Sequence, residues 1–175
     1  MTDRREQITW LAADAIAERG LAGASLREVA SRAGASLGVV TYHFADREDL
    51  LAATMAAVAS AIRQRAGWSR VIDPVERELS AVLPLTPATR RETAVWLAFS
   101  DAATRDAALA DQFADYYREW ETAVGTALAT TGGSAGWAPM LTAMTDGIAL
   151  RTLVTGLSPR RQRELLRDAI RASRH

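Results

Sequence analysis

Apolar residues recur along this chain at the three- and four-residue spacing of amphipathic helices, and no segment shows the alternation of a strand. The first helical segment ends at Gly20, which follows Arg19 as helix-terminating glycines do. Its apolar positions are Ile8, Leu11, Ala12, Ala15 and Ile16. Continued to the end of the chain, the pattern gives about nine helices, so we expect an all-α fold.

Three polar residues in the first third of the chain stand where helices should begin. Ser25 is followed three residues later by Glu28, the pattern of a capping box in which each side chain accepts a backbone amide hydrogen. Ser36 precedes a short apolar stripe, and Asp46 precedes a longer one that runs to about residue 66. Two short helices and one long helix should therefore follow the first.

The two short helices predict a helix-turn-helix. Ala30 supplies the small residue needed where two helices cross closely, and Gly34 tolerates the positive φ of a tight turn. Leu37 and Val40 anchor the second helix from its inner face. The outer face then carries small and polar side chains that can enter the major groove of DNA, namely Gly38, Val39, Thr41 and Tyr42.

The chain beyond residue 67 predicts a second, larger helical domain. The segment 109–128 has the clearest helical period, and the segment 138–156 is apolar on more than one side. The last segment, 159–172, pairs an apolar stripe with arginines. Three of the helices should begin with a capping side chain followed by proline, at Asp73-Pro74, Thr86-Pro87 and Ser158-Pro159.

Composition narrows the chemistry. Cysteine is absent and the imidazoles are limited to His43 and His175, so we expect no thiolate site, no histidine-rich metal site and no cofactor. No apolar run reaches the ~18 residues of a membrane span. The charged N-terminus lacks the apolar core of a signal peptide, which predicts a cytoplasmic protein with no membrane partner.

Net charge gives no sign of nucleic-acid binding. The 21 basic residues are all arginine, and 21 acidic residues balance them. The first 66 residues contain eight arginines and eight acids. A DNA-binding hypothesis must therefore rest on where individual side chains lie.

The segment from residue 5 to about residue 58 resembles the DNA-binding domain of the TetR family of bacterial transcriptional regulators. Four stretches carry the resemblance: AERG (17–20), SLREVASRAG (25–34), GVVTYHF (38–44) and DREDLL (46–51). The resemblance implies that the helix from Ser36 to His43 is the recognition helix. Many members have a tyrosine where this chain has Thr41 and a lysine where it has Arg47.

The resemblance also implies a role for each residue of this region. The expected phosphate contacts are Ser25, Ser36, Tyr42 and Arg47. The expected contacts to base edges are Leu37, Gly38, Val39 and Thr41. His43 is expected to close the end of the recognition helix or to touch the DNA backbone, because no nucleophile or metal partner lies near it in the sequence.

Scattered aromatic and apolar positions of the later part are similar to the C-terminal domain of the choline-responsive BetI branch of that family. The matching stretches are LPLTPATRRETAVWLAF (83–99), RDAALA (105–110), YYREW (116–120) and MTDGIAL (144–150). Together the resemblances imply a DNA-binding domain at 1–46, a connecting helix at 47–66, and an effector-binding and dimerisation domain at 67–175.

Aromatic residues cluster on two successive helices of the second domain. Trp96, Phe99, Tyr116 and Trp120 are candidates to line an effector cavity, although a plain core is an equally good interpretation. Asp146 interrupts an apolar helix, where a carboxylate is costly unless it bonds within the helix or pairs with an arginine. The expected effector is a small molecule, amphipathic or cationic.

The segment 138–156 is more apolar than one neighbouring helix can cover, which predicts a homodimer. Burial against a symmetry mate, with the segment 159–172, gives a four-helix interface. The expected anchors are Met144, Ile148, Leu165 and Ile170, some of which must also serve the subunit's own core.

These features favour a ligand-responsive, homodimeric transcriptional repressor that a small molecule releases from a palindromic double-stranded DNA operator. The connecting helix would transmit the effector's signal as a population shift. Two alternatives stay open at this point: a helical protein-interaction module, and a helical enzyme, which is disfavoured because the sequence shows no catalytic constellation.

Overall fold

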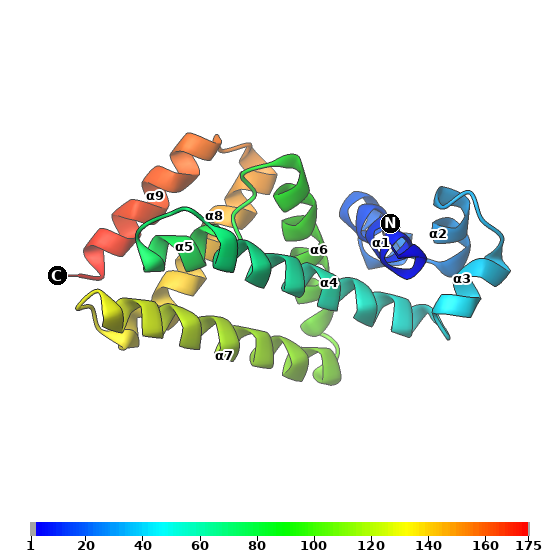
Figure 1. The fold of residues 1–175 in the computed structure, drawn as a ribbon, viewed down its shortest axis with the longest axis horizontal. Helices are drawn as coiled ribbons and strands as arrows, with labels where there is room; N and C mark the ends of the chain where they lie inside the picture. The colour runs from blue at the N-terminus through cyan, green and yellow to red at the C-terminus, as the bar shows by residue number, and fades with distance from the viewer. Residues whose placement is uncertain (1–2, 175) are drawn as a thin grey trace.

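In the computed structural model, which describes residues 3–174, the chain forms nine α-helices and two short 3-10 helices (Figure 1). A small N-terminal domain and a larger C-terminal domain lie along the long axis of the molecule, and the long helix α4 runs from one into the other (Figure 1). The all-α fold and the number of helices expected from the sequence are confirmed for these residues.

The N-terminal domain is a three-helix unit. It consists of α1 (Arg4–Arg19), α2 (Leu26–Arg32) and α3 (Leu37–His43), with the short helix η1 (Leu21–Gly23) between the first two. Its core is made by the inward residues of these helices and the first turn of α4: Ile8, Ala12, Val29, Ala30, Val40, Phe44 and Leu50. Burial of these apolar side chains is what holds the two short helices against α1.

Helix α4 (Arg47–Trp68) belongs to both domains. It begins at Asp46, whose side chain accepts the amide hydrogen of Asp49 as the sequence predicted. One turn later Leu50 packs in the N-terminal core, whereas Met55 and Val58 pack in a second core shared with α1, α6 and α7. The division of the chain at residues 46 and 66 therefore stays a prediction.

Five helices build the C-terminal domain. They are α5 (Pro74–Ser80), α6 (Pro87–Ala103), α7 (Ala107–Thr130), α8 (Ala138–Thr155) and α9 (Pro159–Ala172), with η2 (Ala135–Trp137) before α8. Asp73, Thr86 and Ser158 cap α5, α6 and α9 ahead of the proline, as expected. The capped starts fix where these helices begin and so which of their residues turn inward.

Two of the expected helix caps form differently. Ser25 accepts the amide hydrogen of Glu28, but the Glu28 carboxylate turns away and accepts from Arg32, because an ion pair on the adjacent turn competes with the capping bond. Ser36 stands at the N-cap of α3 without a side-chain capping bond. Its exposed hydroxyl is therefore uncommitted within the subunit.

Within residues 3–174, no helix has both the length and the apolar character that crossing a bilayer requires. The same residues contain no cluster of three or more histidine or acidic side chains placed to hold a metal ion. His175 lies outside the described residues.

Candidate DNA-binding surface and effector cavity

The outward side of α3 is exposed. Val40 is buried as expected, but Leu37, expected as a second inner anchor, is 40% exposed because it lies on the first turn of the helix. Val39 and Tyr42 are 37% and 85% exposed. Large apolar side chains are seldom left on an open helix unless they meet a partner. Ser36, Gly38 and Thr41 are exposed beside them, so all four positions expected to point outward, Gly38, Val39, Thr41 and Tyr42, are exposed.

The turn that presents α3 follows the chemistry expected of it. Gly34 has a φ of 58°, and the following amide of Ala35 donates to the carbonyl of Ala30 on α2. A residue with a Cβ is strained at that φ. The glycine therefore fixes the direction in which α3 leaves α2.

Arg47 is anchored before any DNA arrives. Its Nε donates to the carbonyl of Ala24 at 3.2 Å, and one terminal nitrogen donates to the carbonyl of Leu21 at 2.6 Å. Guanidinium has five N–H donors in a planar fork, so donors remain for a phosphate. The expected phosphate contact stays a prediction, with the side chain already oriented by η1.

Three further candidate contacts, Thr41, Tyr42 and His43, lie on α3 itself. The Thr41 hydroxyl bonds back to the carbonyls of Leu37 and Gly38 within its own helix. The rings of Tyr42 and His43 meet edge to face at 5.1 Å. His43 ends α3 and is only half-exposed, in keeping with a helix-end position.

Several charged side chains of the N-terminal region are paired with one another. Arg32 on α2 binds both Glu18 and Glu28, and this contact lowers the pKa of the Glu18 carboxyl. The carboxylate of Asp49 lies 3.6 Å from Arg5. Arg27 is exposed on α2 and takes part in no ion pair among the described residues. The pairs occupy arginines as well as acids, so they leave the charge balance of this region unchanged.

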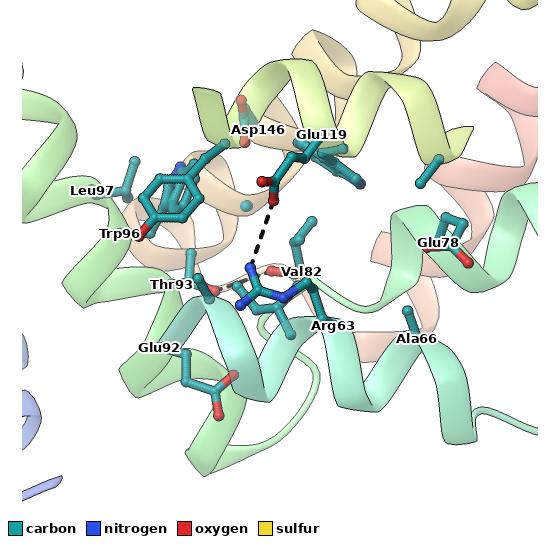
Figure 2. Close-up of a pocket in the computed structure, with 16 residues that line it drawn as sticks. Arg63, Ala66, Glu78, Val82, Glu92, Thr93, Trp96, Leu97, Glu119 and Asp146 are labelled. Carbon is teal, nitrogen blue, oxygen red and sulfur yellow. Dashed lines mark hydrogen bonds and ion pairs between the residues drawn. The ribbon is translucent and has the colours of Figure 1, made fainter. Parts of the chain in front are cut away.

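A cavity of about 160 Å³ lies in the C-terminal domain (Figure 2). Its wall is assembled from α4, α5, α6, α7 and α8, with Val82 from the segment between α5 and α6. Most of the lining is apolar, as in sites for small organic molecules. The lining residues are Ala59, Ile62, Arg63, Ala66, Glu78, Val82, Glu92, Thr93, Trp96, Leu97, Tyr116, Glu119, Trp120, Ala123, Asp146 and Ala149.

Three of the four aromatic residues proposed as effector contacts line this cavity, namely Trp96, Tyr116 and Trp120. The Trp96 and Tyr116 rings lie 5.9 Å apart. Phe99 does not line the cavity: it is 3% exposed and packs, one turn beyond Trp96, in the core that α6 and α7 share with α1 and α4. Residues three apart lie on nearly the same side of a helix, so sequence spacing could not separate the two.

Four carboxylates line the cavity, and three of them lie close to an arginine. Glu92, 5% exposed, accepts from Arg65 on α4 at 2.5 Å. Glu119 on α7 lies 3.8 Å from Arg63 on α4, on the exposed side of the cavity (Figure 2). Glu78 lies 3.7 Å from the adjacent Arg77. Spacing along the sequence did not indicate that arginines on α4 pair with carboxylates on α6 and α7.

The fourth carboxylate, Asp146 on α8, has a different partner. The Tyr117 hydroxyl donates to its Oδ2 at 2.6 Å. Burial raises the pKa of Asp146 to about 6, although the bond from Tyr117 lowers it in part. The sequence suggested a bond within the helix or an arginine partner, whereas the partner is a tyrosine from the facing helix.

Helix α6 touches both the cavity and the N-terminal domain. Glu92 and Thr93 face the cavity, whereas the neighbouring Arg91 reaches α1. Its guanidinium donates to Asp14 at 3.1 Å and lies over the Trp10 ring, 4.6 Å from the centroid. A shift of α6 would therefore change its contacts with α1, in the domain that carries α3.

An apolar stripe on α8 is open to solvent. Its exposed side chains recur four or six residues apart: Met140, Met144, Leu150 and Val154. Gly147 lies on the same face, with nothing within 4 Å of the position a Cβ would occupy. Of the residues expected at a dimer interface, Met144 is on this stripe and Leu165 is partly buried on α9. Ile148 and Ile170, 7% and 3% exposed, lie in the subunit's own core.

Two family models match this chain. Residues 8–54 match the model of bacterial regulatory proteins of the TetR family. Residues 72–175, more than half of the chain, match the C-terminal domain of BetI-type transcriptional repressors. The chain belongs to the TetR family.

TetR-family relatives support this membership over different lengths. The regulator PksA of Bacillus subtilis is 38% identical over 102 residues, which are 55% of this chain and 50% of PksA. The chain thus spans about half the length of that curated relative. A transcriptional regulator from Rhodococcus has a solved structure that is 28% identical, with a TM-score of 0.87 over 98% of this chain and 96% of its own.

A second similar structure carries a ligand. The transcriptional regulator from Saccharomonospora viridis, solved in complex with choline, is 25% identical. Its TM-score is 0.83, over 98% of this chain and 97% of its own. TetR family membership and the BetI-type C-terminal domain, both expected from the sequence, are therefore confirmed.

Proposed function

We propose that this chain is a homodimeric transcriptional repressor that binds a palindromic operator and leaves it when a small molecule enters the cavity. The observation that carries the proposal is the exposed outward face of α3 in a chain of this family. The wall of the cavity includes α4 and α6, which also meet the N-terminal domain, and this supports control by an effector.

On DNA, α3 would lie in the major groove. Leu37, Gly38, Val39 and Thr41 would face base edges, and Thr41 would exchange its bonds to its own helix for a base. A separate group of residues would bind phosphates, and these contacts would set the register of α3 on the DNA without reading its sequence. It comprises Ser25, Ser36, Tyr42, His43 and Arg47.

A dimer would form through α8 and α9. The open stripe on α8, with Met144 at its centre, gives an apolar surface that one subunit leaves uncovered. Gly147 would let the partner's helix approach closely. Two recognition helices about 34 Å apart on one side of the duplex would then read a palindrome.

The effector would act by shifting a population between two arrangements of the domains. Helices α4 and α6 both line the cavity and both reach the N-terminal domain. A molecule that favours one spacing of these helices would move the two α3 helices out of register with successive grooves. The similar structure from Saccharomonospora viridis was solved in complex with choline, which supports a small effector, amphipathic or cationic.

Selection of bound fragments from genomic DNA by the purified protein tests this function. We expect a palindromic site, protected by a dimer, and retention that is lost at high salt. A monomer that binds no duplex at any salt concentration would contradict the proposal. That result would favour a protein-interaction module or an enzyme.

A further inference from the structure

The four carboxylates around the cavity differ in what neutralises them. Glu78, Glu92 and Glu119 each have an arginine within 4 Å. Asp146 has none among the described residues, and its bonding partner is the uncharged hydroxyl of Tyr117. A half-buried carboxylate without a cation is a costly arrangement for a protein to keep.

The surroundings of Asp146 suit a cation that comes from outside the chain. Tyr117, which holds the carboxylate, packs its ring 5.8 Å from that of Trp96 and 6.3 Å from that of Trp120. Both tryptophans line the cavity. Figure 2 shows Asp146 toward the end of the cavity where Trp96 and Leu97 lie, with Glu78 toward the other end. A positive group there would meet aromatic rings as well as the charge.

We propose that Asp146, positioned by the Tyr117 hydroxyl, is the counter-ion that makes the cavity selective for positively charged effectors over uncharged molecules of the same shape. This inference rests on the proposed function, in which the cavity is the effector site. It adds the residue that recognises a cationic effector and the selectivity that this residue gives. Glu78, Glu92 and Glu119 contribute less, because arginines already neutralise them.

A pH dependence follows from the same contact. Because the Asp146 pKa lies near 6, the carboxylate is ionised at pH 8 and mostly protonated at pH 5. The other charged groups of the cavity are Arg63 on α4, Glu78 on α5, Glu92 on α6 and Glu119 on α7, beside the phenol of Tyr116. Helix α9 also packs against α8 but contributes nothing to the described wall. Cation binding should thus weaken about tenfold from pH 8 to pH 5.

The experiment measures binding directly, by tryptophan fluorescence and calorimetry without DNA, so that it is independent of operator binding. The charged probe is choline, and the uncharged probe is tert-butylethanol, in which carbon replaces the nitrogen. We expect the wild type to bind choline at least tenfold more tightly than the alcohol at pH 8. Asp146→Asn should remove that preference and most of the pH dependence. Asp111→Asn, an exposed acid on α7 outside the cavity, is the matched control and should change neither.

Two further variants separate recognition from a structural effect. Tyr117→Phe deletes the bond that lowers the Asp146 pKa, so the midpoint of the pH profile should move upward while binding at pH 9 is largely kept. Glu119→Gln should weaken choline binding less than threefold, because the Glu119 carboxylate already pairs with Arg63.

Three results would overturn the inference. The first is equal binding of the two probes by the wild type, and the second is a choline preference that survives in Asp146→Asn. The third is a wild type that binds no choline even at millimolar concentration. Failure of the proposed function is a different result: a protein that discriminates the probes as described but selects no operator would keep the cation site and lose the repressor.

Discussion

The recognition helix and the effector cavity differ in whether their functional side chains have partners within the chain. The candidate contacts to base edges all lie within the seven residues of α3, and their side chains make no hydrogen bond outside that helix among the described residues. Around the cavity, sixteen residues from five helices and a connecting segment form the wall, and most of its charges are paired within the chain. The DNA surface is therefore open until its partner comes, whereas the cavity is part of what holds its domain together.

The difference predicts where changes cost stability. A substitution on the outward side of α3 removes nothing that folding uses, so it should alter binding alone. A substitution in the cavity wall removes a contact between helices, so it should alter the free energy of unfolding as well. The following variants are arranged from the largest expected effect to the smallest.

Arg65→Ala should cause the largest loss. It strands the nearly buried Glu92 and removes the bond from Arg65 to the carbonyl of Ala81, which ties α4 to the end of α5. Breaking such a pair from one side costs about 3 kcal/mol. Urea unfolding followed by circular dichroism measures the loss.

Two comparison variants sharpen this test. Adding Glu92→Gln to Arg65→Ala should recover part of the stability, because no charge is then left without a partner. Tyr42→Ala should change the unfolding midpoint very little and yet weaken DNA binding. If Tyr42→Ala unfolds the protein as readily as Arg65→Ala does, the contrast between the two regions is wrong.

Asp146→Asn should do the reverse and stabilise the protein. The folded-state pKa of Asp146, about 6, lies above the ordinary value of 3.8. The proton therefore favours the folded state, and its contribution is complete below about pH 4 and lost as pH rises through 6. An asparagine carries no such charge and can still accept from Tyr117. The variant should thus be more stable by about 1–2 kcal/mol at pH 8, with the gap closing by pH 4.

Thermal unfolding of both proteins from pH 4 to pH 8 checks this sign. A gap that stays constant with pH would show that the substitution acts through packing. A wild type that is the more stable at pH 8 would mean that the ionised carboxylate has a cationic partner within the chain.

The local nature of α3 explains why so much of it was predictable. Its exposure depends on residues within one short segment: the Gly34 turn, the inward Val40 and the aromatic end at Phe44. The helix starts at Asp73, Thr86 and Ser158 were equally local, because a cap and a proline act on the turn they precede. The Ser25 box half failed for a reason that spacing could not show, since Arg32 competes for the Glu28 carboxylate.

The cavity could be predicted only in part, because its wall is set by packing between helices. Trp96, Tyr116 and Trp120 were found from their helical spacing, but the same spacing included Phe99, which faces the other domain. Arg65 lies on α4 and meets Glu92 on α6, 27 residues later. Ile148 and Ile170 were expected at an interface, and apolarity alone could not separate them from the subunit's core.

Arg91→Ala tests how the two regions are joined. The guanidinium bridges α6 to Asp14 and Trp10 on α1, so its loss should cost about 1 kcal/mol. Loss of this contact should also weaken the communication between cavity and α3, so that the choline concentration needed to release DNA rises several-fold. Asp14→Asn removes the other partner and should reproduce part of the effect. An unchanged release concentration in both variants would leave α4 as the route.

Arg47→Ala should have the smallest effect on stability. Arg47 belongs to the candidate DNA-binding surface but, like the arginines around the cavity, it already has partners within the chain. Two of the Arg47 donors already bind the carbonyls of Leu21 and Ala24, so the variant should lose somewhat less than 1 kcal/mol of stability. The donors that remain are proposed to meet a phosphate, so the slope of log affinity against log salt should fall by about one. Arg47→Lys keeps the charge but not the planar fork, and it should keep the slope while losing part of the stability. A slope unchanged in Arg47→Ala would assign this arginine wholly to the fold, like the arginines around the cavity.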